Sequence, residues 1–242
     1  MNDMIQFFRQ FAGHLGSSLY AGLRGPVHPQ QLAFLRQMQR ELKESRRQDA
    51  SLQNLKVVVF DLETTGFFPD KGDQVISIGA VKMTGSSIHA NDCFYSLVRC
   101  DAPLSEEVTH LTKITEKMLQ DAPPAADVLM AFFKYIRTND LVAHHSRHEL
   151  RFMQKMTWDV TRTKFAHRIL DTSFLIQLTA PMSAPLPLED VCKSCGIAVR
   201  ERHHALGDAL MTAEVWAHFL SKAQSMGYQT LRDVYDHLAR IS

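Results

Sequence analysis

The 242-residue sequence has few cysteines, no long apolar run and almost no net charge. The chain is long enough to bury a substantial core and therefore does not need disulfides for its stability, which argues against a disulfide scaffold built on its four cysteines. No stretch approaches the roughly 20 apolar residues of a membrane-spanning helix. The first residues also lack the basic segment and cleavage site of a secretory signal. We therefore predict a cytoplasmic protein without a membrane partner.

The charge balance is close to neutral, with 27 Lys and Arg against 26 Asp and Glu, for a formal net charge of +1. A protein of this kind does not attract a polyanion through its overall electrostatic field. If nucleic acid binds, local basic patches or bound cations have to attract it. Hydrophobic residues make up 45% of the chain, which is ordinary for a globular protein and gives no indication of extensive disorder.

Cys192 and Cys195 have the Cys-x-x-Cys spacing of zinc sites and redox motifs. The sequence has no second pair of ligands at the spacing that a structural zinc site needs. The surrounding residues, LEDVCKSCGI, predict a helix that ends at Gly196. This pattern favours structural cysteines over a zinc site or a redox motif.

Two carboxylates, Asp61 and Glu63, stand two positions apart after the apolar run 57–60. Four apolar residues followed by turn formers predict a buried strand that ends at Asp61, in which alternate side chains share a face. Asp61 and Glu63 therefore point to one face and Leu62 to the other. Two adjacent anions at the edge of a core are costly unless a cation lies between them. Because Mg²⁺ is commonly held by one or two carboxylates plus substrate phosphates, the pair predicts a metal site for phosphoryl chemistry.

From Leu55 onward the pattern predicts an α/β domain. Short connections between the first three strands indicate an antiparallel meander, and the alternating strands and helices that follow indicate a mixed sheet covered by helices. The predicted strands are residues 57–61, 75–83, 93–99, 141–145 and 168–170, and the predicted helices are residues 125–136, 148–157, 172–179 and 205–222.

Residues 1–54 differ in pattern from the rest of the chain. Apolar residues at helical spacing predict a helix over 4–19, and a second, basic helix is predicted over 30–48. We expect a helical N-terminal extension (1–54), a main domain (55–222) and a C-terminal helical tail (223–242). The extension either packs on the main domain as a solvated segment, contacts nucleic acid, or docks a protein partner, and the sequence leaves these alternatives open.

Two further acids stand at the head of apolar rows in predicted helices. Glu149 is followed at offsets of three, four and seven by Phe152, Met153 and Met156, which places all four on one helix face. Asp208 leads a similar row in the last long helix. For either acid alone, a favourable position at the helix start or a salt bridge is an equally good explanation. For four carboxylates at the ends of elements in one domain, a shared metal site explains more.

His203 precedes Asp208 by five positions, a spacing that separates two side chains on a continuous helix. The spacing suits a histidine in the loop before the helix, from which its ring can reach the same site. Imidazole is the side chain whose ordinary pKa suits proton abstraction near neutrality, so His203 is the candidate general base. The alternative is a solvated loop histidine, which is the interpretation we give to His204.

Taken in order, these segments resemble the histidine-containing branch of the DEDD 3′–5′ exonucleases, the family of the proofreading subunit of bacterial DNA polymerase III. FDLETTG (60–66) resembles the first motif of that family, LVAHHSRHELRFM (141–153) the second and HHALGDA (203–209) the third. HLTKITEKML (110–119) resembles the segment that lies beside the terminal nucleotide of the substrate. The resemblance covers roughly residues 55–222 and leaves the N-terminal extension outside it.

The resemblance implies a ribonuclease H-like fold and an enzyme that releases nucleoside 5′-monophosphates from a 3′ end by a two-metal mechanism. The implied cofactors are two divalent cations, Mg²⁺ or Mn²⁺. Asp61 is expected to bridge the two ions, and Glu63, Glu149 and Asp208 to complete the set of ligands. His203 is expected to take the proton from the attacking water.

Four further residues are weaker candidates for substrate binding. Thr64 and Thr65 follow the first acids, where their hydroxyl and backbone N–H groups could hold the terminal sugar. Phe67 or Ile114 could stack on the last base or wedge beside it. Roles in a turn or in the core explain these four residues equally well.

Glu149 departs from the family pattern, which usually has aspartate at this position. Glutamate keeps the charge but adds a methylene group, whereas Mg²⁺ requires nearly ideal octahedral geometry. The change could therefore favour Mn²⁺ or weaken the second metal site. Asp159 is a conceivable substitute ligand near the end of the same predicted helix.

The expected partner is the 3′ end of a single-stranded nucleic acid, with DNA favoured over RNA. One rival is an RNA 3′–5′ exonuclease, since the sequence does not reveal contacts to the 2′-hydroxyl. Another is a non-catalytic nucleic-acid-binding module in which Glu149 has disabled the second metal site. A third is a proofreading subunit that docks on a polymerase, or on another protein, through residues 1–54.

Overall fold

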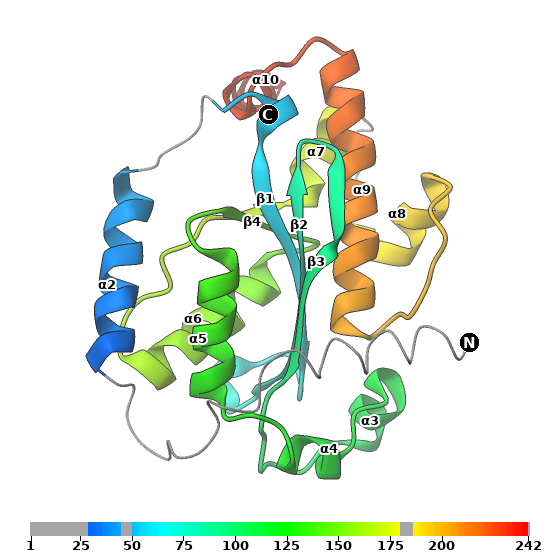
Figure 1. Cartoon of the computed structure of the whole chain (residues 1–242). Helices are drawn as coiled ribbons and strands as arrows, with labels where there is room; N and C mark the ends of the chain where they lie inside the picture. The colour runs from blue at the N-terminus through cyan, green and yellow to red at the C-terminus, as the bar shows by residue number, and fades with distance from the viewer. Residues whose placement is uncertain (1–28, 45–49, 180–185, 242) are drawn as a thin grey trace.

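A five-stranded mixed sheet forms the centre of the computed structural model, which describes residues 29–44, 50–179 and 186–241 (Figure 1). The order of the strands is β3-β2-β1-β4-β5. The pairs β1–β2 and β2–β3 are antiparallel, whereas β1–β4 and β4–β5 are parallel, which confirms the predicted meander and mixed sheet. The strands are β1 (Lys56–Thr64), β2 (Val75–Thr84), β3 (Ser87–Leu97), β4 (Asp140–Ala143) and β5 (Ile169–Asp171).

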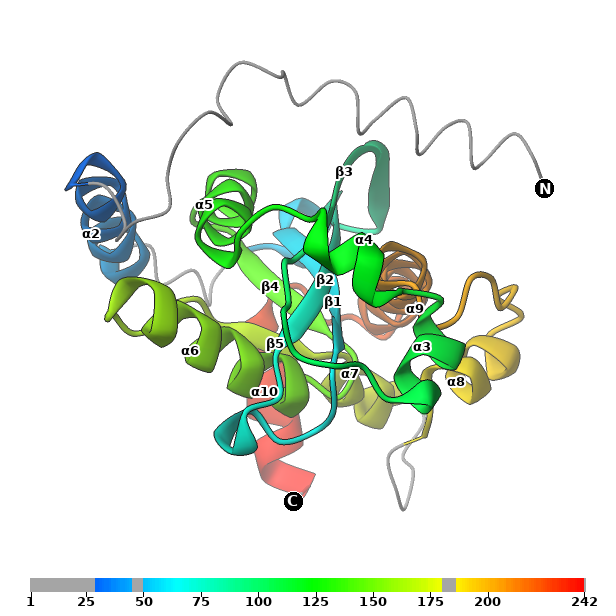
Figure 2. The same ribbon diagram turned by 90° about the horizontal axis from the view of Figure 1, so that it is seen from below.

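Helices cover both faces of the sheet. Helix α9 packs across β1, β2 and β3 on one face with α7 and α8 beside it, and α5 and α6 lie together on the other side (Figures 1 and 2). The helices are α2 (Pro29–Glu44), α3 (Glu106–Thr112), α4 (Glu116–Gln120), α5 (Ala125–Ile136), α6 (Arg147–Thr161), α7 (Thr172–Thr179), α8 (Leu188–Ser194), α9 (Ala205–Ser225) and α10 (Leu231–Ile241), with single 3₁₀ turns η1 (Leu52–Asn54) and η2 (Pro69–Lys71).

Strand β1 contributes to two separate apolar cores. Val57 and Val59 belong to the core that includes residues of α9, whereas Val58 belongs to the core that includes residues of α5 and α6. Because alternate side chains of a strand point to opposite faces, the next two positions on the α9 face are Asp61 and Glu63. The expectation that these two acids share a face is confirmed.

The predicted end of the first strand at Asp61 is wrong. Strand β1 continues to Thr64, so both acids lie inside it. Pairing with β2 extends to Thr64, but β4 pairs only with Val57, Val58 and Val59. Beyond Val59, β1 is therefore hydrogen-bonded to β2 only. The edge of β1 that β4 does not cover leaves room for other elements to approach Asp61 and Glu63.

Other predicted elements are confirmed, several with different ends. The helices predicted over 125–136 and 172–179 have these bounds, and α6 extends beyond both ends of the predicted helix. The strand predicted from Cys93 begins earlier, at Ser87. A tight turn at Gly85, where φ is +55°, lets the chain reverse and pair with β2 at once.

Helix α2 packs on the rest of the protein. Leu35 and Met38 are buried in the core that includes residues of α5 and α6, and the side chain of Gln39 donates a hydrogen bond to the carbonyl of Lys164 (3.0 Å). The helix predicted over 30–48 is thus confirmed with the bounds Pro29–Glu44, and it packs as the first of the three alternatives expects. The helix predicted over 4–19 lies outside the described residues.

Gly79 permits the close approach of α9 to the sheet. It lies opposite Asp61 in the β1–β2 register. A Cβ atom at Gly79 would lie 2.2 Å from the backbone carbon of Ala205 and 2.2 Å from the backbone nitrogen of Leu206. The absence of a side chain at this position therefore brings the first turn of α9 beside the acids of β1.

We expect Gly79→Ala to lower the free energy of unfolding by about 3 kcal/mol or more, because backbone atoms of α9 would have to move. Urea denaturation measures this difference. Ser87→Ala, at an exposed position in β3, is a control for a small change at the surface of the same sheet. If the free energy of unfolding of the Gly79→Ala protein lay within about 0.5 kcal/mol of the wild-type value, this would contradict the close approach of α9 to the sheet.

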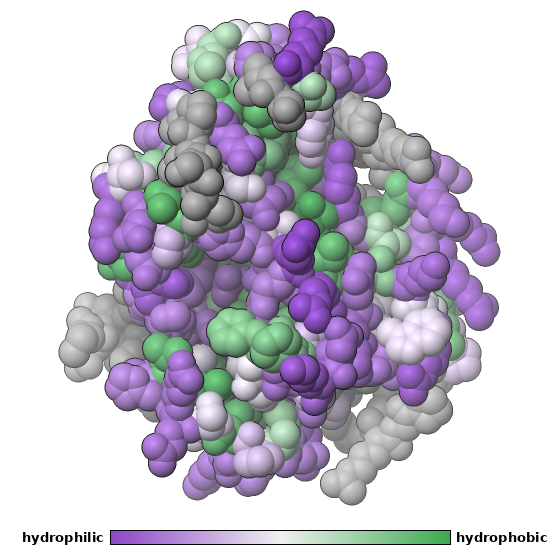
Figure 3. All heavy atoms as spheres, turned by 180° about the vertical axis from the view of Figure 1, so that it is seen from behind, coloured by the Kyte–Doolittle hydropathy of each residue, from purple (hydrophilic) through white to green (hydrophobic). Residues whose placement is uncertain are grey.

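The surface opposite to the view of Figure 1 is mostly hydrophilic, with small hydrophobic patches among the polar residues (Figure 3). Scattered apolar patches are normal on a protein surface and do not by themselves indicate an interface. Among the described residues, no helix combines the length and apolar character needed to cross a membrane.

Candidate active site

The carboxylates of Asp61, Glu63 and Asp208 meet on the α9 face of the sheet. One oxygen atom of each lies within 4.8 Å of the oxygen atoms of the other two. Strand β1 contributes the first two, and the first turn of α9 contributes Asp208. Only 8% of Glu63 and 3% of Asp208 are exposed. Among the residues that the structure describes, these three form the group whose ligand atoms are close enough to hold a metal ion.

Glu149 approaches the same site from the start of α6 but lies outside this group of three. It is 4% exposed, and its negative charge interacts with the charges of Asp61 and Glu63. Its Oε2 atom is buried without a hydrogen-bond partner. The salt bridge that could have explained this residue is therefore not found in the described part of the chain. Its place in the first turn of α6 agrees with the helix-start alternative, but that position leaves Oε2 unsatisfied, and a buried carboxylate oxygen without a partner fits a site for a cation.

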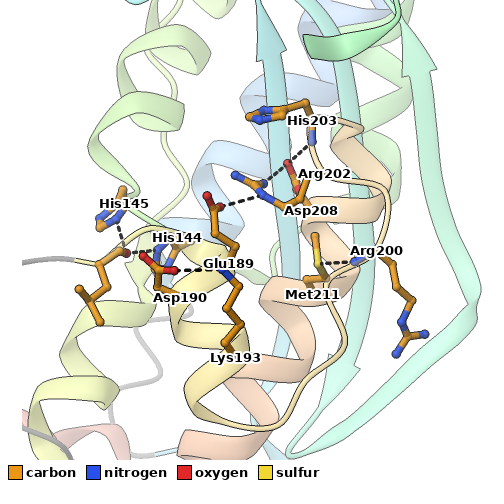
Figure 4. A network of polar contacts seen from close by, with 11 residues as sticks. His144, His145, Glu189, Asp190, Lys193, Arg200, Arg202, His203, Asp208 and Met211 are labelled. Carbon is orange, nitrogen blue, oxygen red and sulfur yellow. Dashed lines mark hydrogen bonds and ion pairs between the residues drawn. The ribbon is translucent and has the colours of Figure 1, made fainter.

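Asp208 has both a cationic partner and a free oxygen atom. Its Oδ2 atom accepts a hydrogen bond from the backbone N–H of His203 (3.0 Å) and pairs with Nη1 of Arg202 (2.5 Å; Figure 4). Its Oδ1 atom is buried without a hydrogen-bond partner. The salt bridge considered for Asp208 is therefore present, yet one oxygen each of Asp208 and Glu149 stays unsatisfied. The set of donors, all carboxylate oxygens, suits a hard divalent cation.

Burial raises the pKa of all four carboxyl groups, and repulsion from neighbouring acids adds to this for Asp61, Glu63 and Glu149. The pKa of Asp61 lies well above its usual range, chiefly because of burial and then because of the charges of Asp208, Glu149 and Glu63. Burial is also the main reason that the pKa of Glu63 and that of Glu149 rise to about 8. The pKa of Asp208 is raised by burial against the opposing effect of Arg202. A bound divalent cation would favour the charged form of each group.

Without metal, the protein is expected to lose stability as the pH rises from about 5 to about 8. The folded chain holds the protons of Glu63 and Glu149 up to a pKa of about 8, whereas their ordinary value is 4.5. The folded state therefore binds more protons than the unfolded state in this window, so the free energy of unfolding falls as the pH increases. Replacing Glu149 by glutamine is expected to reduce this loss and to raise stability near pH 8 by about 1–3 kcal/mol, because a neutral amide replaces a buried charge.

Thermal denaturation in EDTA across this pH range measures both effects. Glu107→Gln, at an exposed position in α3, is the matched control and should leave the pH profile unchanged. If the Glu149→Gln protein and the wild type lost stability equally as the pH rises, this would contradict the assignment of Glu149 as a buried carboxylate that is repelled by the neighbouring acids.

The loop before α9 presents His203 beside the three clustered acids. The backbone of His203 is in the left-handed region, with φ of +61°, as is that of Glu201, with φ of +46°. Non-glycine residues rarely adopt this conformation, and those that do are concentrated at functional sites. Because the backbone N–H of His203 is bound to Asp208, its half-buried side chain begins next to the acidic group.

The prediction that His204 is a solvated histidine is wrong. This residue caps the N-terminus of α9, where its Nδ1 atom accepts a hydrogen bond from the backbone N–H of Gly207 (3.4 Å). Its ring also stacks on that of Tyr95, with 4.6 Å between the ring centres. His204 is therefore engaged through its ring at the start of α9, whereas the contact of His203 with Asp208 uses its backbone N–H.

The weaker candidates for substrate binding have different environments. The hydroxyl groups of Thr64 and Thr65 form hydrogen bonds within the turn that follows β1, as the structural alternative expects. Ile114 is 3% exposed within a small apolar cluster, which favours its core alternative. Phe67 is 73% exposed and makes an edge-on contact with the ring of His148, with 6.0 Å between the ring centres. Of these four residues, Phe67 is the one with a surface available for a base.

Two alternative sites are not supported. Asp159, the conceivable substitute ligand, forms an ion pair with Lys155 near the other end of α6. Cys192 and Cys195 are free thiols, and burial raises the pKa of Cys192 to about 11, which keeps this thiol protonated. These observations favour structural cysteines, as the sequence does.

Two contacts around the acidic site were not predicted from the sequence. Arg202 connects Asp208 to Glu189 of α8, since its Nε atom donates a hydrogen bond to Glu189 Oε2 (3.0 Å). Asp171 holds the start of α6, because its Oδ2 atom accepts a hydrogen bond from the backbone N–H of Ser146 (2.6 Å). The position of Arg202 directly before His203 was a possible signal for its contact with Asp208. An arginine in a loop is usually solvated, however, so the position alone did not identify this contact.

Comparison with known proteins agrees with this geometry. The family model described as Exonuclease matches residues 58–216. The DNA polymerase III subunit epsilon of Aquifex aeolicus is 32% identical over 165 residues, which are 68% of this chain and 80% of that protein. A DNA polymerase III subunit epsilon-like protein of Rhodobacter capsulatus is 33% identical over 189 residues, or 77% of this chain. That alignment covers 27% of the Rhodobacter protein, and a PolC-type DNA polymerase III of Clostridium perfringens is covered to 11%, so the chain spans a small part of these longer relatives.

Solved structures confirm the fold. Escherichia coli exonuclease I in complex with a dT13 oligonucleotide superposes with a TM-score of 0.59 at 13% identity, over 71% of this chain and 42% of that one. A 3′-exonuclease that recognises a histone mRNA stem-loop superposes with a TM-score of 0.61 at 18% identity, over 80% of this chain and 72% of that one. The mixed sheet with helices on both faces is therefore the ribonuclease H-like fold of these nucleases. With its three motifs in order and a family match over most of its length, this chain belongs to the exonuclease family.

Proposed function

We propose that this protein is a metal-dependent 3′–5′ exonuclease that hydrolyses nucleotides from the 3′ end of single-stranded DNA. The observation that carries the proposal is the convergence of Asp61, Glu63 and Asp208 within 4.8 Å, with His203 bound to Asp208 through its backbone. Relatives named as polymerase III epsilon subunits support the activity and the preference for DNA.

The acidic residues have the role of holding divalent cations, Mg²⁺ or Mn²⁺. Asp61, Glu63 and Asp208 would supply the first set of oxygen atoms, and the unpaired Oε2 atom of Glu149 would serve a second ion. When bound, a pair of divalent cations stabilises the negative charge on the attacking and leaving oxygens of the phosphate. Wherever these groups are charged, they would repel the phosphate backbone of the substrate unless cations were bound.

His203 would act as the general base that accepts the proton of the attacking water. Its place in the loop rather than on α9 lets the ring move relative to the acids while the backbone stays fixed to Asp208. Phe67, which is 73% exposed, would offer its ring to a base near the 3′ end.

The N-terminal extension is proposed as the site of a further partner, a polymerase or another protein. Helix α2 buries Leu35 and Met38 against the main domain, and its exposed side carries Arg36 and Arg40. The polymerase III names of several relatives support such a partner, and we place the protein in the cytoplasm on the same grounds. We further propose residues 55–222 as the catalytic unit, within which the family match lies.

Degradation of labelled strands tests the function. Single-stranded DNA labelled at the 5′ or 3′ end, and RNA of the same sequence, would be incubated with Mg²⁺, Mn²⁺ or EDTA. We expect a metal-dependent ladder from 5′-labelled DNA, and immediate release of a labelled mononucleotide from 3′-labelled DNA. If RNA were degraded faster than DNA, RNA would be the preferred substrate in place of DNA. Strand binding without cleavage in either metal would show a binding module in place of the enzyme.

A further inference from the structure

Arg202 introduces a positive charge into a group of acids that is otherwise suited to a metal ion. Its Nη1 atom lies 2.5 Å from Oδ2 of Asp208, in a contact where the Asp208 side chain is 5% exposed and the Arg202 side chain 26%. The charge of Arg202 also acts on Asp61 and Glu63. Within the described residues, it is the arginine or lysine that forms an ion pair with a member of the acidic group.

Arg202 has a second partner that lies outside the acidic group. Its Nε atom binds Oε2 of Glu189 in the first turn of α8, and the Glu189 side chain is 38% exposed. Figure 4 shows the guanidinium group between the two carboxylates, which come from α8 and α9. Because the two contacts use different nitrogen atoms, the contact with Asp208 can be broken while that with Glu189 is kept.

A divalent cation and a guanidinium group repel each other at short range, and the repulsion is strong where water is excluded. Both would be attracted by the same carboxylates. The presence of Arg202 beside Asp208 therefore weakens the binding of a metal ion at this site. This holds whether or not the guanidinium group and the metal use the same oxygen atom of Asp208.

We propose that Arg202 is an internal counterion that stabilises the metal-free site, competes with the divalent cation for Asp208, and is drawn away from the acids by Glu189. This inference rests on the proposed metal site. It makes Arg202 a positioning residue that sets the affinity for metal, and Glu189 the residue that determines how strongly Arg202 competes. The two residues then have opposite effects on metal binding.

The test is Mn²⁺ binding measured by isothermal titration calorimetry at constant pH and ionic strength, on the full chain. We expect Arg202→Gln to bind Mn²⁺ about 5- to 10-fold more tightly than the wild type, since it removes a competing charge. In EDTA the same variant should unfold at a lower temperature, because its acids have lost their counterion. Arg202→Lys keeps the positive charge, so its Mn²⁺ affinity should be close to that of the wild type.

Glu189→Gln provides the matched comparison. In the wild-type background it should weaken Mn²⁺ binding by about 3- to 5-fold, since Arg202 then binds Asp208 more strongly. In the Arg202→Gln background the same substitution should have no effect. A general loss of negative charge would weaken binding equally in both backgrounds, so the double-mutant cycle separates the two explanations.

Tighter Mn²⁺ binding in Arg202→Gln, together with an effect of Glu189→Gln that depends on Arg202, supports the counterion. Unchanged or weaker binding in a folded Arg202→Gln protein would overturn it and would make Arg202 a residue that orients Asp208. If the wild type bound no Mn²⁺ at all, the proposed metal site would fail and this inference with it.

Discussion

Replacing Asp61 by asparagine is expected to lower the rate of 3′-end hydrolysis by about 10³-fold or more. Asp61 is the carboxylate whose charge interacts with those of the other three acids, Asp208, Glu149 and Glu63. Asparagine has nearly the same shape but no charge, so it would weaken metal binding at the centre of the site. Loss of a metal ion removes several kcal/mol of stabilisation of the transition state, and each 1.4 kcal/mol is about a factor of ten in rate.

The rate of nucleotide release from 5′-labelled DNA measures this effect, with Mn²⁺ affinity recorded on the same protein. Asp159→Asn is the matched control, because Asp159 is an exposed partner of Lys155 and should keep the wild-type rate within about twofold. In EDTA the Asp61→Asn protein should be at least as stable as the wild type, since a buried repulsion is relieved. A folded Asp61→Asn protein with wild-type turnover would rule out the assigned site.

Replacing His203 by alanine is expected to lower turnover by about 10²- to 10⁴-fold, the usual contribution of a positioned general base. The metal ligands are the carboxylates of other residues, and the contact of His203 with Asp208 uses the backbone N–H, which alanine retains. Mn²⁺ affinity should therefore stay within about threefold of the wild type. This separation of turnover from metal binding distinguishes the base from a ligand.

Turnover at saturating DNA and calorimetric titration with Mn²⁺ give the two quantities. His218→Ala changes an exposed histidine further along α9 and serves as the control for loss of an imidazole. A His203→Ala protein that hydrolyses DNA at the wild-type rate would exclude the role of base. A parallel loss of turnover and of metal affinity would assign His203 to the metal site instead.

The predictions from sequence succeeded where the interaction is local. Strand alternation placed Asp61 and Glu63 on one face, because this periodicity belongs to any extended strand. Helical spacing placed Glu149 on the buried side of α6, where it is 4% exposed. The His203–Asp208 spacing predicted a histidine in the loop that feeds α9, and α9 does begin after it. Three motifs in order were enough to predict the family.

The errors came from contacts between distant parts of the chain. The predicted end of β1 at Asp61 ignored its pairing with β2, which continues to Thr64. His204 was interpreted as solvated because the sequence does not show that its ring caps a helix and stacks on Tyr95. The cap on Gly207 is local, but Tyr95 lies far from His204 in the chain and β2 pairs with β1 across a loop, so local pattern leaves both features open.

The sequence by itself determined which residues are the candidates for chemistry and which elements present them, since strand and helix periodicity depend on neighbouring residues. Only the tertiary structure decided how the acids converge. Gly79 opposite Asp61 allows α9 to approach the sheet, and this brings Asp208 to the two acids of β1. The same packing leaves Glu149 outside the group of three and inserts Arg202 between Asp208 and Glu189. Such contacts depend on backbone distances across the fold, which no local pattern encodes.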